Sequence, residues 1–160
     1  MPTSATATSS RGRRPRLTLS LQIGPRGIRA PTARQVRRWA SAALTTSGDI
    51  TVRIVGAAEG RRLNFRYRGE THATNVLSFP YGSARGAVRG DIVLCAPVIS
   101  REARAQGKTE EAHYAHLTVH AVLHLQGYDH RRRRDTERME ALEKKLLTKL
   151  GYPDPYEAST

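Results

Sequence analysis

The segment from Thr109 to Gln126 constrains the fold more than any other part of this chain, because it predicts a helix with a defined start and a defined end. Thr109 is a suitable N-cap, and Glu110 and Glu111 fall in the first turn, where the helix dipole favours negative charge. Gly127 supplies the C-terminal stop.

Two histidines on this helix, His120 and His124, are spaced to bind one metal ion. At a rise of about 1.5 Å per residue, their side chains project from one face about 6 Å apart along the axis. The following glycine lets the chain turn back, so His130 can complete a set of three nitrogen ligands. Each histidine alone has a packing role as its alternative, but no packing rule requires three imidazoles around one turn. The sequence therefore predicts one zinc ion held by His120, His124 and His130, with a fourth position open for water, and it predicts His113 and His116 to be non-ligands.

The same spacing matches the run H-E-x-x-H-x-x-G-x-x-H of one class of zinc metalloproteases. In those enzymes the glutamate after the first histidine deprotonates the attacking water. Ala121 stands at that position here, so peptide hydrolysis by that route lacks its general base.

The remaining pattern predicts one core, because a chain of 160 residues is long enough for one sizeable domain. Residues 1–16 are small, polar and basic, which predicts a disordered tail; residues 17–156 form the expected domain, and residues 157–160 a short C-terminal tail. Cys95 lies in an apolar run and is expected to pack in the core, and one cysteine cannot form an internal disulfide. Alternation predicts strands at 17–23, 50–55, 74–80 (ended by Pro80) and 90–96, and helical spacing predicts helices at 31–44, 57–65, 97–107, 109–126 and 135–150.

The net charge is +13, from 27 basic and 14 acidic residues, which favours polyanionic partners such as nucleic acid or the ribosome. No run approaches the roughly 20 apolar residues that span a bilayer, and we expect a cytoplasmic protein without a membrane partner. The segment before Asp49 has no acidic residue and is rich in Ser, Thr and Arg. That composition is also typical of an organellar transit peptide, so import into an organelle stays open.

Four segments, taken together, resemble the YbeY family of bacterial and organellar endoribonucleases, over roughly residues 50–156. They are "LNFRYRGETHATNVLSFP" (63–80), "GDIVLCAPVI" (90–99), "HLTVHAVLHLQGYDH" (116–130) and "GYPDPY" (151–156). The resemblance implies a single-domain α+β fold, with a mixed four-stranded sheet packed with helices and a zincin-like metal-binding helix. It departs from the family at Ala121, where glycine is usual, and at the basic run Arg131, Arg132, Arg133 and Arg134, where the family is often acidic.

The resemblance also implies an activity: zinc-dependent hydrolysis of single-stranded RNA, in maturation of the 3′ end of small-subunit ribosomal RNA and in ribosome quality control. The expected partners are ribosomal RNA and the ribosome or its small subunit with associated proteins, and DNA is not expected. By the same resemblance Arg68 lies near the metal and, with His120, matters for catalysis; without the resemblance, an ion pair of Arg68 with Glu70 is the preferred interpretation.

The residues suggest how such a site works. Zinc held by three neutral imidazoles keeps its positive charge, binds a phosphodiester oxygen and lowers the pKa of a bound water to about 7. RNA also carries its own nucleophile, the 2′-hydroxyl, and the sequence leaves open which of the two attacks. Arg68 is expected to clamp a phosphate oxygen, and Arg131 to Arg134 to bind the RNA backbone, their alternative being a solvated helix start.

Two aspartates have open alternatives: Asp129 orients an imidazole or caps a loop, and Asp91 supports the site or begins a strand. A different class of function is also open, a ribosome-assembly factor that binds RNA or ribosomal protein and whose zinc site is mainly structural.

Overall fold

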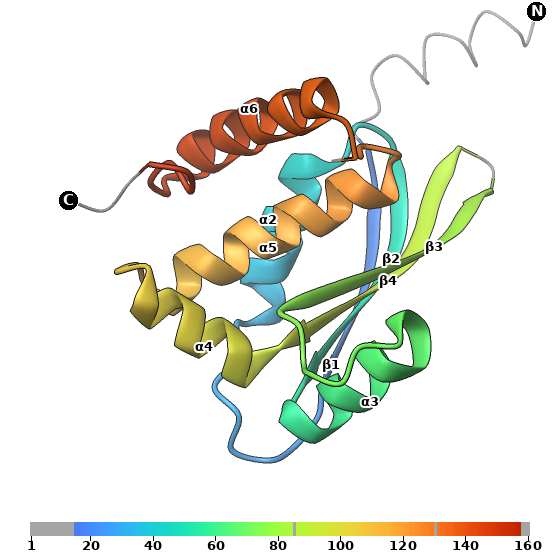
Figure 1. The fold of residues 1–160 in the computed structure, drawn as a ribbon. Helices are drawn as coiled ribbons and strands as arrows, with labels where there is room; N and C mark the ends of the chain where they lie inside the picture. Colours follow the sequence, from blue (N-terminus) through green and yellow to red (C-terminus); the bar gives the residue numbers. More distant parts are fainter. Residues whose placement is uncertain (1–14, 85, 130, 158–160) are drawn as a thin grey trace, which may run out of the picture.

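The computed structural model describes residues 15–84, 86–129 and 131–157 and shows one mixed sheet with helices on both faces (Figure 1). The sheet has four strands in the order β1-β2-β4-β3. Its elements, in chain order, are β1 (Leu17–Ile23), α2 (Ala33–Ala43), β2 (Ser47–Val55), α3 (Ala57–Arg68), β3 (Val76–Ala84), β4 (Ala87–Cys95), α4 (Ala96–Ala105), α5 (Glu110–Leu125) and α6 (Arg133–Leu150).

Three strands run parallel, and one edge strand runs against them. β1 pairs with β2 and β2 with β4 in parallel, so each pair needs a connection that crosses the sheet. α2 makes the first connection, and α3 with β3 makes the second. β3 is antiparallel to β4 and forms the edge. The sheet is therefore mixed and four-stranded, and with its helices it confirms the expected α+β fold class.

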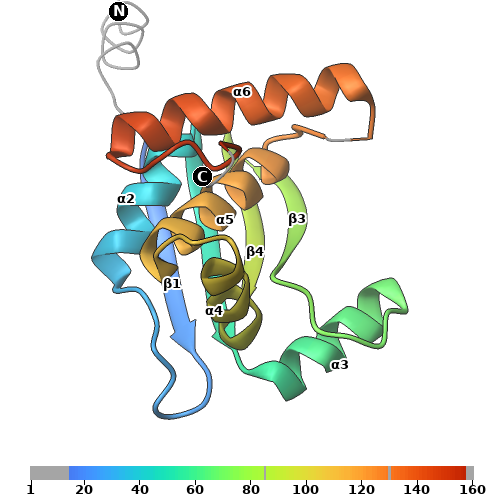
Figure 2. The ribbon, with the colours of Figure 1, turned by 60° about the vertical axis from the view of Figure 1, so that its left-hand side comes forward.

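The two faces of the sheet bury unequal cores. On one face α2 and α5 pack over β2 and β4, with Trp39 and Ile92 fully buried, and α6 lies outside α5 (Figure 2). On the other face α3 covers a smaller cluster that includes Leu77 and Cys95. The packing role expected for Cys95 is confirmed, because its side chain is buried in this cluster.

The edge strand differs from the sequence prediction. Pro80 was expected to end the strand, and that prediction is wrong: β3 continues to Ala84. An edge strand tolerates proline, because one side of its backbone has no partner strand to bond. The register also shifts between Pro80 and Ser83, which marks a bulge.

The helix boundaries follow their caps. Thr32 and Gln35 form a capping box at the start of α2, and Thr109 caps α5 by accepting a hydrogen bond from the amide of Ala112. α3 continues beyond the expected end to Arg68, where Gly69 closes it with a positive φ of 70°.

The expected tails fall mostly outside the described residues, since only part of 1–16 and of 157–160 is described. Arg16, in the N-terminal segment, is bonded to the sheet, because its amide donates to Ser47 Oγ at 3.1 Å. Within the described ranges, no helix is long and apolar enough to cross a membrane.

Candidate metal centre

The centre is built on α5, most of which is buried. Its residues pack against the sheet, α2, α4 and α6, so the helix has little freedom to move. His120 and His124 lie one turn apart on this helix, as predicted, and both are half-buried. His120 retains 28% side-chain exposure, which leaves its ring accessible to a small ligand.

A buried carboxylate from α6, Glu143, lies directly behind His120. Its side chain is only 1% exposed, and each oxygen faces a donor from another element. Oε1 lies 2.8 Å from Nε2 of His116 and accepts a hydrogen bond from the Tyr156 hydroxyl at 2.7 Å. Oε2 lies 3.0 Å from Nδ1 of His120. One carboxylate thus joins α5, α6 and the C-terminal segment.

The electrostatics of this cluster keep Glu143 ionised. Burial alone would raise the pKa of the carboxyl, but the hydrogen bonds from His116 and His120 outweigh burial. Together with the bond from Tyr156, they lower the pKa of Glu143 to about 2. The same environment raises the pKa of the Tyr156 phenol, through burial first and then its bond to Glu143, so Tyr156 acts as a donor.

The donor set suits a metal at two of the three predicted positions. His120 uses Nδ1 for Glu143, so Nε2 is the ring nitrogen that faces away from this carboxylate. By contrast, His113 and His116 both use Nε2 for carboxylates, of Glu102 and Glu143 respectively. His130 lies outside the described residues, and within them no group of three His, Cys, Asp or Glu side chains forms a complete metal site.

Comparison with known proteins identifies the family of this chain. A family model described as endoribonuclease YbeY matches residues 29–151, which is most of the chain. The chain belongs to the endoribonuclease YbeY family.

Relatives within the YbeY family match most of the chain. The endoribonuclease YbeY of Aromatoleum aromaticum is 54% identical over 141 residues, which cover 88% of this chain and 91% of that protein. The one of Nitrosomonas europaea is 47% identical over 156 residues, which cover 98% and 94%. The solution structure of TM1509 from Thermotoga maritima shares the fold, with a TM-score of 0.50 and 21% identity over 88% of this chain and 99% of that one.

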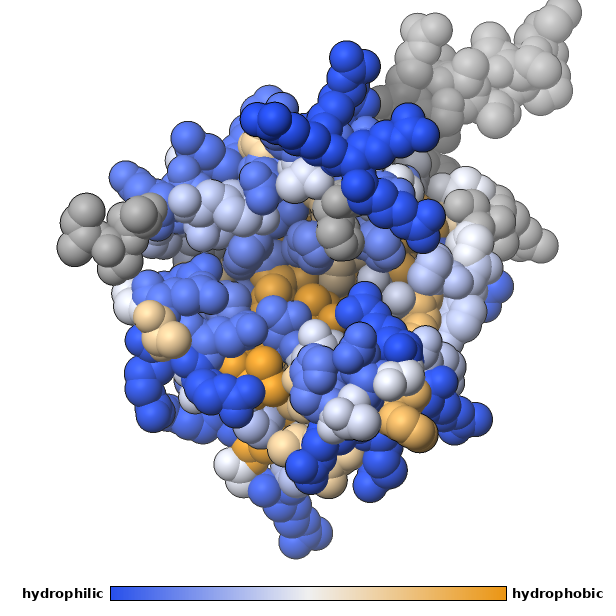
Figure 3. Space-filling model, viewed as in Figure 1, coloured by the Kyte–Doolittle hydropathy of each residue, from blue (hydrophilic) through white to orange (hydrophobic). Residues whose placement is uncertain are grey.

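The four arginines after the last predicted ligand are all exposed. The side chains of Arg131 and Arg133 are 90% and 94% exposed; Arg131 lies 3.8 Å from Asp129, and Arg133 donates a hydrogen bond to Glu137 at 3.3 Å. Figure 3 shows strongly hydrophilic side chains over the start of α6, above a hollow in the middle of the same face where hydrophobic residues are exposed. The run therefore offers positive charge to a partner beside α5.

Three other expected residues have structural surroundings of their own. Asp129 has the loop-capping role, since it accepts a hydrogen bond from the Arg131 amide at 2.7 Å. The carboxylate that contacts the imidazole of His120 is Glu143. Asp91 lies inside β4 rather than at its start, and it accepts a hydrogen bond from Tyr81. Arg68 is the exposed last residue of α3; within the described part of the chain it makes no ion pair, and Glu70 instead lies 3.8 Å from His72.

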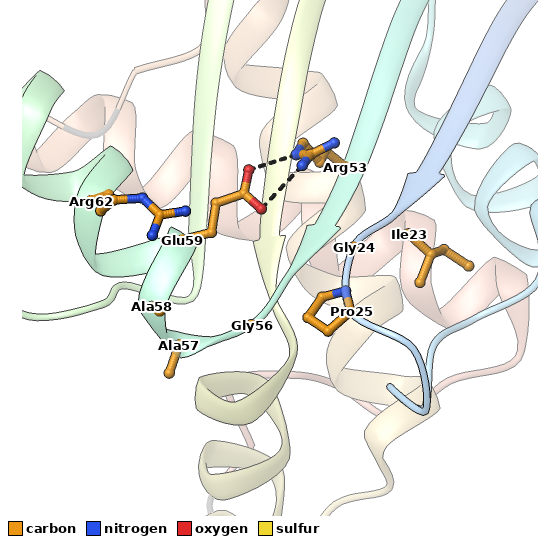
Figure 4. A pocket seen from close by; sticks show the side chains of 9 residues that line it. All are labelled: Ile23, Gly24, Pro25, Arg53, Gly56, Ala57, Ala58, Glu59 and Arg62. Carbon is orange, nitrogen blue, oxygen red and sulfur yellow. Dashed lines mark hydrogen bonds and ion pairs between the residues drawn. The ribbon is translucent and has the colours of Figure 1, made fainter.

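A separate groove of about 560 Å³ lies at the ends of β1 and β2, and its lining includes no histidine (Figure 4). Its wall contains the paired side chains of Arg53 and Glu59, joined by hydrogen bonds of 2.8 and 3.0 Å. This pairing satisfies the charges of Arg53 and Glu59 within the protein, and Arg62 also lines the groove.

The sequence reasoning missed Glu143, although a signal for it exists. Glu143 falls between Met139 and Leu147 at helical spacing, on the face of α6 that packs against the core. A carboxylate on an apolar face is costly unless it is paired, so it indicates a buried partner. The sequence did not show which partner, because α5 and α6 meet only in the folded chain.

Proposed function

We propose that the protein is a zinc-dependent endoribonuclease that cleaves single-stranded RNA, with His120, His124 and His130 as the metal ligands. Membership of its family makes it an endoribonuclease, a hydrolase that acts on RNA. The observation that carries the metal assignment is the pair of half-buried imidazoles one turn apart on α5, one of which is backed by a buried carboxylate. Metal-binding histidines commonly have such a partner on their second nitrogen.

The residues divide the work in a simple way. A bound zinc ion supplies a positive charge for a phosphodiester oxygen and acidifies water. α5 fixes the spacing of His120 and His124, while Glu143 holds the ring of His120 from behind. The position that carries the base in metalloproteases is Ala121 here, a buried residue that provides no carboxylate. The lack of that base is less damaging with RNA, whose 2′-hydroxyl is a nucleophile within the substrate.

Single-stranded RNA suits the surface chemistry of the described residues. The exposed arginines that follow Asp129 provide contacts to phosphates. Exposed aromatic rings lie on α3 (Phe65 and Tyr67) and on β3 (Tyr81). Tyr67 contacts the partly buried Phe79 at 4.8 Å between centroids, and Arg66 lies over the Tyr67 ring. Aromatic rings beside arginines are typical of surfaces on which unpaired bases stack.

Arg68 is proposed to contact a phosphate near the metal, by its match to the family's arginine. Its exposure and its place at the end of α3 leave the guanidinium available. Arg68→Lys keeps the charge but loses the planar fork. We therefore expect kcat to fall while RNA affinity changes little, and equal kcat for both proteins would refute the role.

The proposed substrate is ribosomal RNA, which is processed at the 3′ end of the small-subunit species and during ribosome quality control. The proposed partner is the ribosome with its proteins. The bacterial origin of the relatives supports a cytoplasmic site of action. The net charge of +13 supports a large RNA partner.

The arginine run is tested by its salt dependence. Replacing Arg131 to Arg134 with serine should weaken RNA binding and reduce the slope of log affinity against log salt by up to about 3, since each lost phosphate contact removes about 0.7 to 0.9. A matched control removes four exposed cations elsewhere. Those control residues are Arg34, Arg101, Lys145 and Lys149. Equal slopes in the two variants would show that the run makes no specific contribution.

Cleavage itself is tested with His120→Ala and with His72→Ala as its matched control, since His72 is exposed and remote in sequence from α5. Purified nuclease-free proteins of equal stability are compared on one single-stranded RNA. We expect cleavage and zinc content to be lost only in His120→Ala. Equal residual cleavage by wild type and His120→Ala would instead favour the assembly factor with a structural metal.

A further inference from the structure

We propose that Glu143 is a positioning residue: it holds His116 and His120 in opposite tautomers, so that Nε2 of His120 faces the metal with its lone pair. This inference rests on the proposed function, because it takes His120 as a ligand.

The argument begins with the hydrogen-bond capacity of a carboxylate. An ionised carboxylate only accepts hydrogen bonds, so each ring nitrogen that contacts it carries the proton. His116 contacts Oε1 through Nε2, and His120 contacts Oε2 through Nδ1. The proton therefore lies on Nε2 in His116 and on Nδ1 in His120, although the two rings are one helical turn apart.

The opposite tautomers separate two roles. In His120 the Nδ1 proton leaves the lone pair on Nε2, the nitrogen directed away from Glu143. In His116 the lone pair is on Nδ1, which is buried and has no hydrogen-bond partner within the described residues. His116 thus anchors Glu143 and does not compete for the metal.

The C-terminal segment completes this clamp. Gly151 ends α6 with a positive φ of 96°, and the chain folds back under α6 toward α5 (Figure 2). Tyr152 is fixed by bonds with Trp39 and Glu111, at 2.9 and 2.6 Å. Tyr156 then donates to Glu143, so the carboxylate cannot turn away from the histidines without breaking three contacts.

The experiment uses Glu143→Met, which has similar length and no acceptor oxygen. Methionine keeps the volume, but removing one partner of a buried polar network is destabilising, so the fold of the variant is checked before it is compared. Its control is Glu102→Met, which removes the carboxylate on His113, at the other end of α5. Should Glu143→Met fail to fold, Glu143→Gln replaces it. An amide has only one acceptor oxygen, so at least one of the two imidazoles must change its tautomer.

Two measurements separate positioning from simple support of the fold. Nitrogen-15 NMR of the metal-free proteins reads the tautomer of each histidine, and chelator competition gives zinc affinity. We expect opposite tautomers of His116 and His120 in wild type and in Glu102→Met, loss of the Nδ1–H form of His120 in Glu143→Met, and zinc affinity about 10- to 100-fold lower there.

The outcomes separate this proposal from the proposed function. If His120→Ala loses zinc while Glu143→Met keeps both the wild-type tautomer and full zinc affinity, the positioning role is wrong and the metal site stands. If His120→Ala binds zinc as tightly as wild type, the metal assignment itself is overturned, and the positioning role with it.

Discussion

The close approach of α5 to β4 depends on the absence of a side chain at Gly90. A Cβ placed there would lie 2.6 Å from Leu125 Cδ2 and 2.9 Å from the backbone oxygen of Phe79. Gly90 is not among the glycines with positive φ, so the backbone accepts alanine and the cost is steric. Leu125 directly follows His124, so this contact seats the end of α5 that carries the predicted ligands.

The size of the effect follows from these distances. Overpacking costs about 1 to 3 kcal/mol, and alanine recovers about 0.4 to 1 kcal/mol by restricting the unfolded chain. We therefore expect Gly90→Ala to lower the free energy of unfolding by about 1 to 2 kcal/mol, and Tm by about 2 to 8 °C. Leu125→Ala alone should cost about 2 to 5 kcal/mol, because Leu125 is buried.

The assay is urea unfolding followed by the fluorescence of Trp39, the only tryptophan, which is fully buried. In the double variant the clash with Leu125 is gone, while the clash with the Phe79 oxygen remains. Its loss of stability should therefore be about 1 kcal/mol smaller than the sum of the single losses. Strict additivity, or a Gly90→Ala protein as stable as wild type, would refute the close-approach argument.

Three further predictions concern stability. Burial lowers the pKa of His113 below 6.5, with its bond to Glu102 as a partial offset. The unfolded chain therefore binds more protons than the folded one between the two pKa values, so the metal-free protein should lose stability as the pH falls below about 6.5. His113→Gln should flatten that part of a profile of the urea midpoint against pH. Thr109→Ala removes the cap of α5 and should cost about 1 kcal/mol, against almost nothing for the exposed Thr148→Ala, in the same unfolding assay. Glu59→Gln breaks a partly exposed pair with Arg53 and should cost less than about 1 kcal/mol, and a larger loss that high salt does not reduce would contradict this estimate.

Much of the fold was predictable because its signals are local. Caps and glycines mark the ends of α2 and α5, and alternation marks β1 and β2, so these elements follow from neighbouring residues alone. The end of β3 was not predictable in this way. Whether a proline ends a strand depends on whether the strand lies at an edge, and only the sheet order decides that for Pro80.

The sequence by itself determined the spacing of His120 and His124, because a helix places residues four apart on one face whatever surrounds it. It also determined the family, through motifs that span most of the chain. Only the tertiary structure decided what lies behind His120. Glu143 and Tyr156 reach His116 and His120 from far along the chain, through the packing of α6 on α5 and the return of the C-terminal segment. Such contacts depend on how helices pack, a choice made by the whole core and not by any local pattern.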